Sequence, residues 1–193
     1  MIYLFDKEEQ LIKVVRRNAI KSALQKYALT TDNYVSDRVT VEMKALNDDE
    51  LEKVEYMAIQ SMENTHLFHY FYIAQKSTKG EISTFTGVQS GIEELRKTPV
   101  FDKRPKNTPA KPVINELLQG TNWQARFIAD TTNHSTNFYY TSVFDALKKI
   151  CKVWGLEMQF FVEMNSNGIG ARYIDFKKKI GEAVGKRVVY GHN

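Results

Sequence analysis

Short runs in which apolar and polar side chains alternate dominate the first half of the chain. Residues 37–43 alternate in this way and are rich in β-branched side chains, which is typical of a half-buried strand. The apolar runs 2–5 and 11–15 flank a polar stretch and predict a hairpin. The aromatic run 67–74 is followed, after a Thr-Lys-Gly turn signal, by the alternating run 81–88, so we expect these two to pair antiparallel. Short antiparallel strands of this kind favour a small barrel or sandwich.

Two further segments of the first half have helical features. Residues 47–56 place acidic side chains ahead of Leu51 and Val54, which suits the positively polarised first turn of a short helix. Residues 19–27 are short and bounded by polar residues, and their pattern fits either a helical turn or the start of a strand.

Prolines mark a change in the chain close to residue 98. Four prolines are interleaved with Lys and Asn over residues 98–112, and we expect this stretch to be a linker. Residues 112–119 then have a proline near their start and Gly120 just beyond their end, which is the arrangement expected of a helix. A second unit therefore begins here.

The second unit mixes helix and strand. Residues 143–154 repeat apolar side chains on one helical face, with Ser142 as the expected N-cap and Gly155 as the residue that ends the helix. Residues 123–128 alternate as a strand, and residues 137–140 are expected to be extended.

A second hairpin and a last strand complete the pattern. Residues 156–162 and 169–176 flank an Asn-Ser-Asn-Gly turn and predict this hairpin. Residues 188–190 have the pattern of the start of a final strand. Because the sequence stops at Asn193, just after that strand begins, we expect an internal boundary and a natural protein that continues.

The pattern as a whole predicts a β-rich α+β protein with two domains. Residues 1–97 are expected to form a small antiparallel barrel-like domain that is incomplete on its own. Residues 98–193 are expected to form an inserted α+β domain with a return strand at its end. A chain of 193 residues has room for two small units of this size.

Composition narrows the class of protein. With 42% hydrophobic, 12% aromatic and 26% charged residues, the chain can pack a core and has no disorder signature. Its first residues contain no apolar run long enough for a signal peptide or a membrane helix. The single cysteine, Cys151, cannot form an internal disulfide and lies in a periodic apolar segment, so a buried core thiol is favoured over a reactive nucleophile.

Basic and aromatic residues raise the question of nucleic-acid binding. The net charge of +4 permits such contact, but the densest basic runs, 103–106 and 177–179, are expected to be solvated loops or turns. Aromatic residues in a basic groove can stack on bases, but in a mostly apolar strand the filling of a core is favoured. The aromatic group in question consists of Phe68, Tyr70, Phe71 and Tyr72.

Candidate ligands and acids do not assemble into a metal, phosphate or carboxylate site. His66 and His69 have the spacing of metal ligands on a helix, but in a strand they would point to opposite faces. Gly168 and Gly170 lie in a hairpin and match no phosphate-binding loop. The acidic pairs Asp48-Asp49 and Glu93-Glu94 are expected to mark solvated faces and give no support to glycosidase chemistry.

One polar stretch contains the residue types of a nucleophilic site. Asp130 and His134 lie close in sequence to Asn133 and Ser135, but the stretch predicts a loop and offers no third group that would orient them. The sequence therefore predicts no catalytic residue, no cofactor-binding residue, no metal ligand and no cofactor.

Five segments, taken together and in order, resemble the N-terminal region of phage minor structural proteins. These proteins are also called prophage endopeptidase tail proteins, or tail-associated lysins, of long-tailed phages that infect Gram-positive bacteria. The segments are residues 1–14, 85–98, 103–124, 135–160 and 172–193. The likeness covers nearly the whole chain, and its specificity comes from the collinear set, since no single motif in it is catalytic.

The resemblance implies a hub fold similar to the first half of phage baseplate-hub proteins. It implies a homotrimer in the assembled tail, located at the tail tip of the virion and assembled in the host cytoplasm. The expected partners are the distal tail protein and the tape measure protein, with DNA only in transit through the lumen. The lytic activity of the family belongs to C-terminal domains, so the resemblance implies a structural, non-enzymatic role for this segment. A cell-wall hydrolase that uses His134 or Cys151 and a nucleic-acid-binding module are the alternatives.

Overall fold

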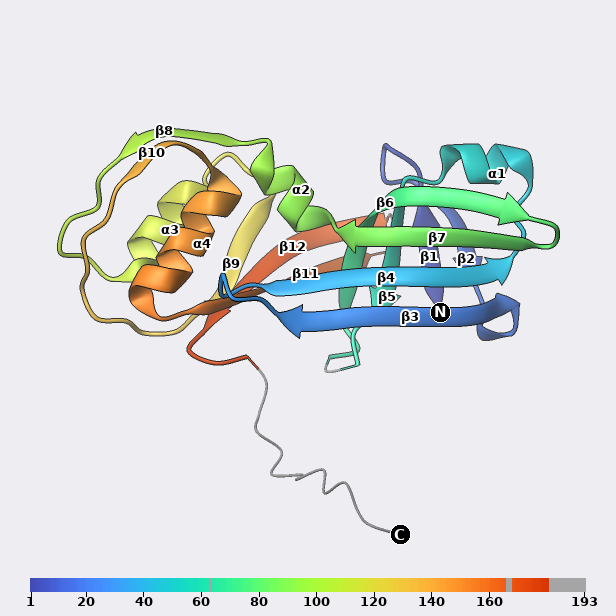
Figure 1. Cartoon of the computed structure of the whole chain (residues 1–193), viewed down its shortest axis with the longest axis horizontal. Helices are drawn as coiled ribbons and strands as arrows, with labels where there is room; N and C mark the ends of the chain where they lie inside the picture. The colour runs from blue at the N-terminus through green and yellow to red at the C-terminus, as the bar shows by residue number, and fades with distance from the viewer. Residues whose placement is uncertain (63, 166–167, 181–193) are drawn as a thin grey trace, which may run out of the picture.

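The computed structural model describes residues 1–62, 64–165 and 168–180, and it has a β-rich α+β fold with one large, mostly antiparallel sheet (Figure 1). The elements of the first half are β1 (Ile2–Phe5), β2 (Leu11–Val15), β3 (Ile20–Leu29), β4 (Val35–Lys44), α1 (Asp48–Lys53), β5 (Tyr56–Gln60), β6 (Leu67–Lys79), β7 (Ile82–Gln89) and α2 (Ser90–Arg96). The second half contributes β8 (Pro99–Lys103), α3 (Ala110–Leu118), β9 (Trp123–Ile128), β10 (Phe138–Ser142), α4 (Val143–Trp154), β11 (Glu157–Asn165) and β12 (Gly168–Lys177).

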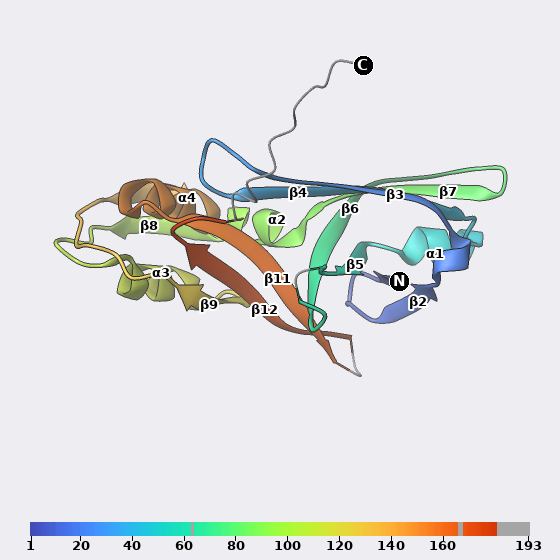
Figure 2. The same cartoon turned by 90° about the horizontal axis from the view of Figure 1, so that it is seen from below.

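Strand β6 is the branch point of the ten-stranded sheet. One edge of β6 pairs antiparallel with β5. The other edge is divided, because Leu67 and Phe68 pair with β11, whereas the part from Phe71 onward pairs with β7. One branch then runs β7-β4-β3 and the other runs β11-β12-β9, in which β9 lies parallel to β12 (Figure 2). Strands from both halves of the sequence therefore share one sheet.

The strand series β2-β1-β5-β6-β7-β4-β3 packs on the smaller of two hydrophobic cores. Nowhere in the described residues does β2 pair with β3, so this series does not close into a barrel. The expected β-rich α+β fold is confirmed. The part that was expected to be barrel-like is an open sheet. The buried residues of this core include Leu4, Val15, Val39, Val41, Met43, Val54, Met57, Phe71 and Phe85.

The larger core lies between the helices α2, α3 and α4 and the strands β9, β11 and β12. Helix α4 begins at Ser142, whose Oγ accepts a hydrogen bond from the backbone N–H of Asp145 at 3.1 Å. It ends at Gly155, which has a φ of 63°, in the left-handed region that favours glycine. Both expected ends of this helix are confirmed.

The aromatic run of β6 is buried on both faces of the sheet. Successive strand residues point to opposite faces. Tyr70 accordingly belongs to the larger core, and Phe71 belongs to the smaller one. Core filling by this run is therefore confirmed for the residues Tyr70 and Phe71, whereas Tyr72 is exposed.

The expected proline-rich linker is wrong over part of its length. Residues 99–103 form strand β8, which pairs antiparallel with β10, and helix α3 already begins at Ala110. Proline is tolerated here because Pro99 is the first residue of a strand in a two-stranded sheet, where its missing N–H costs little.

Other local expectations are resolved by the structure. Of residues 19–27, Ala19 ends a 3-10 helical turn over Arg17–Ala19, and residues 20–27 belong to strand β3. The short helix expected within 47–56 is α1, and Asn47 and Glu50 form a capping box at its start. The hairpins β1–β2, β6–β7 and β11–β12 are all present. The final strand expected at 188–190 lies outside the described residues.

Candidate functional site

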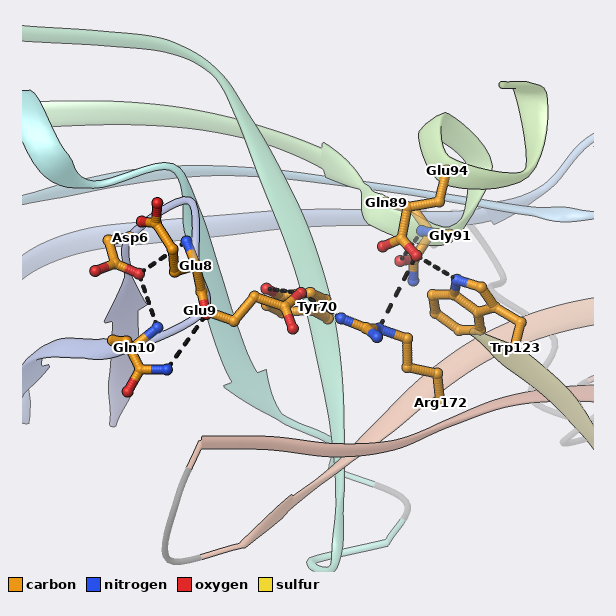
Figure 3. A network of polar contacts seen from close by, with 10 residues as sticks. All are labelled: Asp6, Glu8, Glu9, Gln10, Tyr70, Gln89, Gly91, Glu94, Trp123 and Arg172. Atoms are coloured by element: carbon orange, nitrogen blue, oxygen red, sulfur yellow. Dashed lines mark hydrogen bonds and ion pairs between the residues drawn. The ribbon is translucent and has the colours of Figure 1, made fainter. Parts of the chain in front are cut away.

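The turn between β1 and β2 directs a glutamate into the molecule. The Asp6 carboxylate accepts the backbone N–H groups of Glu8 at 3.0 Å and Gln10 at 2.8 Å, which fixes the turn (Figure 3). Glu9 has a φ of 61°, a left-handed conformation that costs a residue other than glycine about 1 kcal/mol. Backbone strain of this kind gathers at functional positions, which indicates a role for the Glu9 side chain.

Arg172 on β12 receives the Glu9 carboxylate. Its Nη2 donates a hydrogen bond to Oε1 of Glu9, and its Nε lies 4.0 Å from Oε2 of Glu94. The side chain of Arg172 is only 12% exposed. Burial opposes the charge of the guanidinium, but the nearby carboxylates of Glu94 and Glu9 outweigh it, so the pKa of Arg172 is raised.

Two aromatic residues complete the cluster by donating hydrogen bonds to the carboxylates. Tyr70 Oη donates to Oε1 of Glu9 at 3.0 Å, and Trp123 Nε1 donates to Oε2 of Glu94 at 2.8 Å. Burial raises the pKa of Glu94, although the charge of Arg172 and the indole N–H act in the opposite direction. Burial also raises the pKa of Tyr70, with a further contribution from the negative charge of Glu9.

We call the five residues Glu9, Tyr70, Glu94, Trp123 and Arg172 the junction cluster. They come from the β1–β2 turn, β6, α2, β9 and β12, so they connect elements of both halves of the sequence. The guanidinium lies between the two carboxylates in Figure 3. This arrangement places one cation between two partly buried carboxylates, and it connects neighbouring elements of the fold.

Helix α2 approaches the cluster closely because of a glycine. A Cβ added at Gly91 would lie 2.6 Å from Cδ1 of Phe160 and 2.8 Å from Cζ2 of Trp123. A side chain at this position would therefore push α2 away from β9 and β11. Gly91 sets the distance at which Glu94 meets its two partners.

The cavity beside Glu94 is small. It has a volume of about 170 Å³ and is also lined by Tyr56, Ser90 and Lys97. Small-molecule sites usually have about 300–1,000 Å³. The cavity is therefore smaller than the usual small-molecule site. Among the residues that the structure describes, no group of three His, Cys, Asp or Glu side chains could hold a metal ion.

The histidines singled out by their spacing have different environments. His69 Nδ1 lies 2.7 Å from Oδ2 of the buried Asp37, which joins β6 to β4. His66 is exposed and lies just before β6 begins. The spacing of these two residues does not bring them to a common site.

The polar stretch around His134 is a loop, as expected. The His134 ring packs edge-on against Trp154 with 5.8 Å between ring centroids, and its Nε2 lies 3.0 Å from Oγ1 of Thr132. Ser135 Oγ instead accepts the backbone N–H of Asn107 at 2.9 Å. The serine and the histidine therefore have separate structural partners.

The remaining candidates are placed as follows. Cys151 is fully buried in α4, and burial raises the pKa of its thiol. Within the first basic run, Lys103 pairs with Glu116 and Arg104 pairs with Asp102 at 2.9 Å. The burial of Cys151 agrees with the expected core thiol. The ion pairs of Lys103 and Arg104 agree with a basic run in contact with solvent.

Glu94 is more buried than its sequence context predicts, with a side chain that is 28% exposed. Beside Glu93 it was expected on a solvated face, but Trp123 and Arg172, which are distant in sequence, cover it. The roles of Glu9 and Arg172 were missed. One signal for Glu9 was available: it occupies a hairpin turn at a position where glycine is the usual residue.

Comparisons with known proteins give a family match for part of the chain and similarities to solved structures, of which one is described here. Residues 98–176 match the family model described as "Prophage endopeptidase tail domain". The fold is similar to that of an E. coli protein described as a component of the type VI secretion system with structural similarity to the T4 bacteriophage tail proteins gp27 and gp5. That similarity has a TM-score of 0.46 and 9% sequence identity, and it covers 82% of this chain and 48% of that chain. The chain thus aligns with about half the length of that protein. No curated protein matches it in sequence.

Within the part of the chain that the structure describes, no helix is both long and apolar enough to cross a bilayer.

Proposed function

We propose that this chain is a structural component of a phage tail tip, because residues 98–176 match the family model of the prophage endopeptidase tail domain. In this role it closes the tail tube and links the distal tail protein to the host-facing tip, as part of a longer tail-associated lysin. The observation that carries the proposal is the family match. The collinear resemblance of residues 1–14 and 85–98 to the same family extends it to the first half of the chain.

We propose that the protein acts as a homotrimer in the assembled tail of the virion. Its other partners would be the distal tail protein and the tape measure protein, with DNA passing only through the lumen. The open series of strands from β2 to β3 supports this proposal, because it leaves both end strands free to meet a neighbouring surface.

In this proposal the chain consists of two units, residues 1–97 and 98–193, and the first unit is a barrel-like hub domain. The start of the family match at residue 98 and the presence of two separate cores support it. The pairing of β6 with β11 means that the two units would share a sheet. They would therefore behave as one rigid body rather than as two domains on a flexible linker.

The proposed role is non-enzymatic. Its support is the junction cluster, in which the guanidinium of Arg172 takes the space between the two carboxylates. The separate structural partners of His134 and Ser135 point the same way. Any peptidoglycan-degrading activity would then belong to other parts of a longer protein.

Light scattering on the complete protein tests the structural role. We expect a trimer, either alone or after addition of the distal tail protein of the same phage. A monomer under both conditions would overturn the proposed hub.

Zymography on purified peptidoglycan tests the non-enzymatic part separately. We expect no clearing by residues 1–193. Clearing that is lost in His134→Ala or Cys151→Ser would assign hydrolase activity to this chain and would contradict the proposal.

A further inference from the structure

The outer face of the β8–β10 ribbon carries an exposed group of three aromatic side chains. Phe101 is 65% exposed, Tyr139 is 66% exposed and Tyr140 is 70% exposed. The ribbon lies at the end of the molecule that holds α3 and α4, away from the strands of the first half (Figure 1). We call these three residues, together with the groove beside them, the ribbon surface.

A strained backbone exposes the third ring. In a regular strand, residues 138 and 140 would point to the same face and residue 139 to the other. Phe138 is buried and Tyr139 is exposed, as alternation requires. Tyr140 breaks the alternation, because its φ of 43° turns the side chain outward, and the ladder pairs Tyr139 with Asp102 and Thr141 with Val100 but skips Tyr140.

This conformation costs free energy and exposes an aromatic ring to water. Residues other than glycine rarely adopt a positive φ, and such strain gathers at functional sites. A neighbouring ring packs edge-on against Tyr140 on each side. The centroid distance is 4.6 Å to Tyr139 and 6.1 Å to Phe101. Exposed aromatic groups of this kind are typical of the centre of a protein interface.

A groove that contains two cationic side chains adjoins the rings. It has a volume of about 310 Å³ and is lined by Arg96, Lys97, Phe101 and Tyr140, among other residues. None of the eight described residues that line it carries a carboxylate. Arg96 pairs with Glu93 at 3.2 Å, so Lys97 is the lining cation that forms no ion pair with the described residues. The complementary ligand is therefore acidic and has an apolar part that fits against the rings.

We propose that the ribbon surface docks an acidic segment of a partner protein that inserts an apolar side chain between Phe101 and Tyr140. In the described residues β8 and β10 pair only with each other, so each has a free edge that can bond to an extended peptide. The rings stand edge to face and form no flat platform for successive bases, which favours a peptide over single-stranded DNA. This inference does not depend on the proposed tail-tip function.

Binding of a random copolymer of glutamate and tyrosine to the 193-residue protein tests the proposal. Fluorescence anisotropy at low salt gives the affinity, with polyglutamate and a thymidine oligonucleotide as comparison ligands. We expect the copolymer to bind more tightly than either comparison ligand. No binding of the copolymer, or tighter binding of the oligonucleotide, would overturn the proposal.

Two variants locate the binding to the ribbon surface. Tyr140→Gly removes a ring and relieves the strained φ, so we expect binding to fall about tenfold while the melting temperature is kept or raised. Lys97→Glu reverses one groove charge, and we expect a similar loss of affinity. Phe127→Ala, which removes an exposed aromatic side chain on β9, is the matched control and should bind as the wild type does. Unchanged affinity in both Tyr140→Gly and Lys97→Glu would place the binding elsewhere and contradict the proposal.

Discussion

The indole Nε1 of Trp123 donates a 2.8 Å hydrogen bond to Oε2 of Glu94, and this bond joins β9 to α2 inside the junction cluster. The bond stabilises a carboxylate that burial disfavours. The stability of the fold should therefore depend on the protonation of Glu94.

The free energy of unfolding of Glu94→Gln should increase relative to that of the wild type as the pH rises. The pKa of Glu94 in the folded state is raised above its ordinary value of 4.5, so the folded state holds a proton that the unfolded state has already lost. The ionisation of Glu94 therefore lowers the free energy of unfolding of the wild type as the pH rises from 4.5 through the raised pKa. Urea denaturation at a series of pH values measures the effect. Glu93→Gln is the control, and a constant difference between Glu94→Gln and wild type would contradict the expectation.

Glu9→Gly should be more stable than Glu9→Ala. Both substitutions remove the ion pair with Arg172 and the hydrogen bond from Tyr70. Only glycine adopts the φ of 61° without strain, which gives it an advantage of about 1 kcal/mol. Chemical denaturation of the two variants side by side gives this difference, and equal stability would mean that the turn relaxes at no cost.

Gly91→Ala should destabilise the protein by about 1–3 kcal/mol, because the new methyl group overlaps the rings of Phe160 and Trp123. The neighbouring Ser90→Ala is the control. It adds no atom and removes a buried hydroxyl that makes no hydrogen bond to the described residues, so it should be neutral or slightly stabilising. Thermal unfolding of both variants tests the close approach of α2, which would be refuted by a neutral Gly91→Ala.

Cys151 should not react with a thiol reagent in the folded protein. Its side chain is fully buried, and burial raises the pKa of the thiol, so little thiolate is present near neutral pH. Reaction with Ellman's reagent should follow the urea unfolding curve, with tryptophan fluorescence as the parallel measure of unfolding. Rapid labelling without denaturant would show that α4 opens locally.

Elements whose determinants lie close together in sequence could be predicted. The ends of α4 follow from Ser142 and Gly155, which act within one turn of the helix. The β6–β7 hairpin follows from the turn signal between two apolar runs. Each of these signals is local, so the sequence contains them in readable form.

Features that depend on distant partners could not be predicted. Strand β8 looked like part of a linker because Pro99 begins it and three more prolines follow it in the sequence, whereas its partner β10 begins only at Phe138. Glu94 looked solvated because the residues that cover it, Trp123 and Arg172, belong to other strands of the fold. The parallel pairing of β9 with β12 likewise has no local signature.

The division of β6 between two neighbours has a consequence for how the chain unfolds and refolds. Because Tyr70 and Phe71 belong to different cores, the release of this strand exposes both cores at once. Unfolding should therefore be a single cooperative transition, even though the chain has two cores. Refolding must bring together partners as far apart in sequence as Glu9 and Arg172, which are separated by 163 positions, so high contact order should make it slow.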